Sequence, residues 1–177
     1  IHFDCCTIGC WPMCGRNGFA GESAENSECT RPPPTSWNSG DTAGAKVTAE
    51  QGRNTLEQLY RDQPDNLGVS AFLSQAYAVM GQKDAALKEA ERGITLLPRA
   101  KDQVTGPAAE ENLALIQTMF GENSRAISTL TRLLQTPYIG SVYIGLPVTP
   151  ALLRLDPIWD PLRADPAFQK LCEEKQP

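Results

Sequence analysis

The feature that most constrains this chain is an internal repeat. Pro64 and Pro98 are 34 residues apart, and so are Gly52 and Ala86. A second interval of 40 residues relates Gly81 to Gly121, Ala86 to Ala126, Leu87 to Ile127, Ile94 to Leu134 and Leu73 to Leu113. The longer interval predicts an insertion in a loop at Arg99–Gly106. Repeats of this length predict a structural unit that stacks against its own copies, because one unit alone cannot bury its apolar face.

Hydrophobic periodicity predicts that each unit is a pair of helices. One stripe at helical spacing consists of Leu73, Ala76, Tyr77 and Met80 and is broken by Gly81; the next consists of Ala86, Leu87, Ala90, Ile94 and Leu97 and ends at Pro98. These stripes follow the 3.6-residue period of a helix, and comparable stripes recur in the second copy. No segment combines strand-like alternation with hairpin turns. The predicted fold is therefore all-α, an antiparallel helix-pair solenoid.

The repeat resembles the tetratricopeptide (TPR) family. One unit carries Leu73, Tyr77, Gly81, Ala86 and Pro98 at the family's positions, and the other carries Leu113, Gly121 and Ala126. Residues 45–64 resemble only the second helix of a preceding unit. The chain departs from the pattern at Gly93, where alanine is usual, and at Gln117, where an aromatic residue is usual.

A second resemblance covers residues 153–171, which are similar to the ending of bacterial TPR proteins. In that group the repeats follow a serine/threonine kinase, a winged-helix or a nucleotide cyclase domain. Asp156, Asp160 and Asp165 each precede a proline, a pattern that favours helix starts over paired catalytic acids. We expect short helices whose apolar residues, Trp159, Leu162, Phe168 and Leu171, cover the end of the last repeat.

Composition divides the chain into three parts. Residues 1–44 contain no Leu, Val or Lys but hold five of the six cysteines, so they lack the side chains that build a core. They are predicted to be an irregular or disordered Cys/Gly/Pro-rich segment, with an out-of-frame, non-native sequence as the alternative. Residues 45–137 are predicted to form the TPR-like repeats, and residues 138–177 a loop and capping helices.

Charge and hydropathy argue against several kinds of partner. The net charge of −5 argues against a nucleic acid or an anionic membrane surface. No apolar run approaches the roughly 20 residues that span a bilayer. The chain starts without Met and without a signal-peptide pattern, so we expect a fragment of a longer cytoplasmic protein.

Few residues could support chemistry. His2 is the single histidine, which leaves little basis for a Ser-His-Asp or Cys-His site. A zinc module formed by Cys5, Cys6, Cys10 and Cys14 with His2 is an alternative, although the thiols lack the two separated pairs typical of such modules. No phosphate-binding glycine motif occurs. The pair Glu110–Glu111 is interpreted as a solvated face.

The resemblance implies a function in protein interaction, without catalysis or cofactor. TPR arrays bind through the surface lined by the first helix of each pair, which here gives the candidate residues Gln75, Val79, Glu111, Asn112, Leu115 and Met119. The expected partner is a protein, a peptide or another domain of the same longer chain. These positions include no Lys or Arg cluster, so a clamp for a peptide carboxylate is not expected. The alternatives are the zinc module and a non-catalytic part of a kinase or cyclase.

Overall fold

The computed structural model describes residues 42–139 and 147–173. Its elements are α2 (Thr42–Asp62), α3 (Leu67–Val79), α4 (Lys83–Leu96), α5 (Pro107–Met119), α6 (Asn123–Leu134), α7 (Pro150–Leu155), the 3-10 helix η1 (Pro157–Leu162) and α8 (Pro166–Glu173). Within these two ranges every regular element is a helix, which confirms the all-α prediction. Residues 42–44, predicted to be irregular, belong to α2, which is a correction. Residues 1–41 lie outside the described part.

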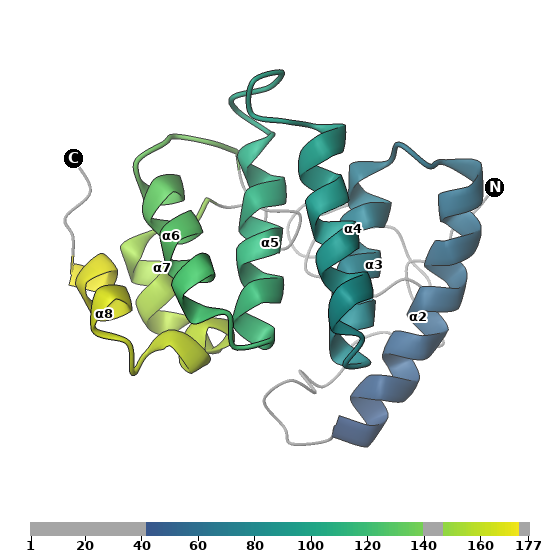
Figure 1. Ribbon diagram of the computed structural model, residues 1–177, viewed down its shortest axis with the longest axis horizontal. Helices are drawn as coiled ribbons and strands as arrows, with labels where there is room; N and C mark the ends of the chain where they lie inside the picture. Colours follow the sequence, from purple (N-terminus) through teal and green to yellow (C-terminus); the bar gives the residue numbers. More distant parts are fainter. Residues whose placement is uncertain (1–41, 140–146, 174–177) are drawn as a thin grey trace, which may run out of the picture.

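The helices pack in chain order (Figure 1). α3 packs against α2 and α4, and α5 packs against α4 and α6. α3 also contacts α5, so the first helices of the two pairs are neighbours. This order follows from the short connections, which place consecutive helices side by side.

The turn inside each pair is built twice in the same way. Gly81 has a φ angle of 76° and Gly121 one of 72°, a conformation that glycine adopts without a Cβ clash. The residue after each glycine closes the helix end: Gln82 N donates to the Tyr77 carbonyl at 2.9 Å and Glu122 N to the Gln117 carbonyl at 2.8 Å. The two glycines predicted to break the helices therefore reverse the chain in both pairs.

Alanine occupies the equivalent buried position in each second helix. Ala86 on α4 and Ala126 on α6 are completely buried. Ala86 belongs to an apolar cluster with Ala90, Leu113 and Ile116, which joins the two pairs. A small side chain at this position lets the helices approach closely, as the sequence predicts.

The insertion between the pairs forms a compact loop. Asp102 Oδ1 accepts hydrogen bonds from Val104 N and Thr105 N, both at 2.9 Å. Gly106 N donates to the Asp102 carbonyl at 3.0 Å, and a Cβ on Gly106 would lie 2.5 Å from that oxygen. The loop thus closes on itself immediately before α5.

The C-terminal elements pack on the last helix pair. Trp159, Leu162, Phe168 and Leu171 are buried in one cluster with Leu130 and Leu133 of α6. The Asp156 side chain accepts from Ile158 N at 3.0 Å and the Asp165 side chain from Ala167 N at 2.8 Å, so both cap a helix start. Asp160 instead accepts from the guanidinium of Arg163.

Candidate interaction surface

The six predicted groove residues lie on the two adjacent first helices. Gln75 and Val79 lie on α3, and both are half-buried. On α5, Glu111, Asn112 and Leu115 are buried, and Met119 is half-buried. The two helices are in contact, so the structure brings the six residues onto neighbouring elements but leaves them unequally exposed.

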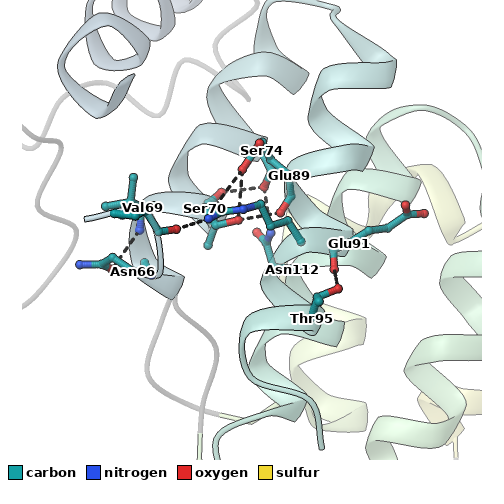
Figure 2. Close-up of polar contacts among 12 residues, drawn as sticks. Asn66, Val69, Ser70, Ser74, Glu89, Glu91, Thr95 and Asn112 are labelled. Carbon is teal, nitrogen blue, oxygen red and sulfur yellow. Dashed lines mark hydrogen bonds and ion pairs between the residues drawn. The ribbon is translucent and has the colours of Figure 1, made fainter. Parts of the chain in front are cut away.

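An amide chain links α3 to α5 (Figure 2). Gln75 Nε2 donates to Asn112 Oδ1 at 2.9 Å. Asn112 Nδ2 in turn donates to Ser74 Oγ at 2.9 Å, the part of the chain that Figure 2 labels. Ser74 is completely buried and donates to the Ala71 carbonyl at 2.7 Å. Because Ser74 and Asn112 are buried and hydrogen-bonded to each other, they fix how the two helices pack.

A second serine ties α3 to α4. Ser70 Oγ donates to the Glu89 carbonyl at 2.7 Å, and Ser70 is completely buried (Figure 2). At the start of the same helix, the Asn66 side chain accepts from Gly68 N and Val69 N and so caps α3. Ser70 thus fixes the packing of α3 on α4, as Ser74 does for α3 on α5.

Glu111 is held by a tyrosine from the segment after α6. Tyr138 Oη donates to Glu111 Oε2 at 2.6 Å and accepts from Val148 N at 2.8 Å. Burial, together with the nearby Glu111 carboxylate, raises the pKa of Tyr138 well above 10.0. The phenol therefore stays protonated and links the segment to α5.

Glu110 lies in a separate ion-pair network. Arg99 Nη2 and Arg132 Nη2 donate to Glu110 Oε2 at 2.9 and 3.0 Å, and Arg99 Nη1 donates to Thr136 Oγ1 at 3.0 Å. Glu110 is 7% exposed and Glu111 is 6% exposed. The interpretation of Glu110–Glu111 as a solvated face was wrong, because both glutamates are buried and pair with groups from other segments.

The chain's own C-terminal part covers the face of α5. Leu115 belongs to the apolar cluster that contains Tyr138, Trp159 and Leu162, and η1 contacts α5. The corresponding face of α3 is more open. Phe72 is 37% exposed there and lies three residues before Gln75, on the same helix face. Its helical spacing from Gln75 and Val79 was the signal that could have added it to the predicted set.

Two features of the described residues bear on metal binding and on thiol chemistry. Among residues 42–139 and 147–173, no three His, Cys, Asp or Glu side chains are grouped closely enough to hold a metal ion. Cys172 is half-buried, and burial raises the pKa of its thiol, which disfavours the nucleophilic thiolate. His2, Cys5, Cys6, Cys10 and Cys14 lie outside the described residues, so the zinc alternative stays a prediction.

In the described ranges, no helix has both the length and the apolar character needed to cross a bilayer.

Comparisons with known proteins identified no relative of this chain. No protein-family model, no curated protein and no solved structure matches this chain.

Proposed function

We propose that this chain is a TPR-like helical array that acts as a protein-interaction module. The support is the internal repeat together with its physical counterparts: Gly81 and Gly121 form equivalent turns, and Ala86 and Ala126 are equivalent buried contacts. Arrays of this kind form extended surfaces from successive helices, and such surfaces suit partner binding. On this proposal, the chain positions another protein and performs no chemistry itself.

The observation that carries the proposal is the open face of α3. Phe72, Gln75 and Val79 form one stripe there, with Phe72 37% exposed. The neighbouring face of α5 is covered by Tyr138 and η1. A partner that presents an apolar side chain beside a hydrogen-bonding backbone would match Phe72, Val79 and the Gln75 amide.

The wider setting is proposed from the sequence resemblance. Residues 153–171 resemble the ending of bacterial multidomain signalling proteins, so we place the array in a longer cytoplasmic protein of that type. Its partner would be another protein, a peptide or another domain of the same chain. The array would then be the non-catalytic part of that protein.

Peptide selection tests the proposal. A displayed library of random 16-residue peptides is selected against the full chain, and the recovered peptides are titrated against variants. We expect binders whose affinity falls at least about tenfold for Phe72→Ser/Val79→Ser, because the apolar contacts are lost.

The matched control is Gln58→Ala on the exposed side of α2, which should leave affinity unchanged. Recovery of no binder, or of binders that are equally affected by both variants, would contradict a docking site on α3.

A further inference from the structure

The loop between α4 and α5 carries a feature that the repeat does not require. In Figure 1 this loop projects beyond the ends of the helices. Val104 on the loop is 47% exposed, and Ile139 after α6 is 67% exposed. Ile139 N donates to the Val104 carbonyl at 2.9 Å, so the two apolar residues are adjacent although 35 positions separate them in the sequence.

The backbone that presents Val104 is held in place from both sides. Asp102 fixes the two amides at residues 104 and 105, and Gly106 packs too closely against the Asp102 carbonyl to admit a side chain. Arg99, at the start of the loop, binds Glu110 of α5 and Thr136 beyond α6. A preorganised loop loses less conformational entropy on binding than a flexible one.

Three basic residues, Lys101 and Arg99 on the loop and Arg132 on α6, lie in the same part of the molecule, since both arginines pair with Glu110. Lys101 is exposed, and the side chains of Arg132 and Arg99 are 57% and 27% exposed. Of the two nearby acids, Glu110 is buried against the two arginines, whereas Asp102 is half-exposed and accepts from the loop's own amides. The three basic residues outnumber the two acids, so this region is slightly positive in a chain whose net charge is −5.

We propose that Val104 and Ile139 are the centre of a second docking surface, and that its partner is a protein segment with aliphatic side chains flanked by carboxylates. The aliphatic side chain would cover the exposed pair, and the carboxylates would face Lys101 and the two arginines. This surface is separate from the α3 face, since it is formed by the inserted loop and the segment after α6. The inference therefore does not depend on the function proposed above.

The test uses the full chain carrying Phe72→Ser/Val79→Ser, which removes the apolar contacts of the docking site proposed on α3. Random 16-residue peptides are selected against this variant, and binding is measured at low and high salt. We expect selected peptides to combine Leu, Ile or Val with Asp and Glu. Adding Val104→Ser or Ile139→Ser should weaken binding at least about tenfold, and Lys101→Glu should weaken it and reduce the salt dependence.

Two other exposed apolar residues serve as matched controls. Val47→Ser on α2 and Leu155→Ser on α7 remove comparable apolar side chains, 56% and 72% exposed, elsewhere on the surface. They should leave binding unchanged. Recovery of no peptide, peptides without acidic residues, or binding insensitive to Val104→Ser would each overturn the inference. Thermal unfolding of every variant verifies that the fold is retained, as expected for exposed positions.

Discussion

At the scale of single residues, Gly93 of α4 lies close to both neighbouring helices, α3 and α5. It is buried in α4, where a Cβ would lie 3.3 Å from Leu67 Cδ1 and 3.7 Å from Ala109 Cβ. The sequence identifies this position as one that is usually alanine in the family it resembles. The contacts leave nearly enough room for that methyl group, and the nearest atom is the tip of the half-exposed Leu67 side chain.

Gly93→Ala is therefore expected to stabilise the fold by about 0.5–1 kcal/mol, because alanine favours the helix interior over glycine. Urea unfolding of both proteins measures the difference. Gly52→Ala on α2 is the matched control, since a Cβ there meets nothing within 4 Å. If Gly52→Ala stabilises the protein and Gly93→Ala destabilises it, the Leu67 side chain does not yield as we expect.

The raised pKa of Tyr138 leads us to expect that the folded protein loses stability in alkali. The folded-state pKa of this tyrosine is raised above 10.0 by burial and by Glu111. Above about pH 10 the unfolded chain loses this proton while the folded chain keeps it, so stability falls by about 1.4 kcal/mol per pH unit from this group. Below pH 10 the contribution is fully present.

Urea unfolding between about pH 9 and pH 11 tests this sign, with Tyr138→Phe as the reference. The variant is less stable at neutral pH because Val148 N loses an acceptor, but it lacks the tyrosine's alkaline loss. Lysine titration affects both proteins alike. Equal slopes for the two proteins would show that Tyr138 is not held protonated by the fold.

At the scale of elements, the helix pairs could be predicted because their determinants are local. Apolar spacing, Gly81 and Gly121 define α3 to α6 without knowledge of distant partners. The exposure of α5 could not be predicted in this way. Glu110 and Glu111 lie in a helical stretch that reads as solvated, and their partners Arg99, Arg132 and Tyr138 come from other segments.

The same reason limited the prediction of the candidate surface. Gln75 and Val79 were named from their place on the first helix of a pair, and both are half-exposed. The burial of Asn112 and Leu115 depends on α3 and on the C-terminal elements, which approach only in the folded chain. The spacing of residues along a helix tells on which side of the helix each one lies. Whether that side is exposed depends on which other segments pack against it.

Ala86→Glu tests the contact between paired helices. Ala86 is completely buried, so the substitution brings a carboxylate into an apolar cluster. We expect a loss of about 3 kcal/mol or more, measured by urea unfolding. Lys88→Glu, which introduces the same residue at an exposed position of α4, should change stability by less than about 0.5 kcal/mol. An unchanged stability for Ala86→Glu would contradict the packing of α4.

At the scale of the whole molecule, the C-terminal elements complete the core of the last helix pair. Phe168 of α8 is 1% exposed and shares a cluster with Leu130 and Leu133 of α6. The last pair thus has its apolar side covered by η1 and α8, much as the first pair is covered by α5.

Phe168→Ala is expected to destabilise the protein by about 3–5 kcal/mol, because it leaves a cavity in this cluster. Calorimetric or urea unfolding measures the loss. Lys170→Ala, two residues further on and on the exposed side of α8, is the control and should have little effect. A small effect of Phe168→Ala would mean that α8 contributes little to the core.

The packing of helices in chain order also has a mechanical consequence. α2 is attached chiefly through α3, and α3 and α4 precede α5 and α6 along the same row. Tension applied at the two ends would load these contacts in series, so that each carries the same force and the weakest separates first. The molecule would then lengthen as helices separate from their neighbours. It would shorten again when the load is removed and the same helices repack.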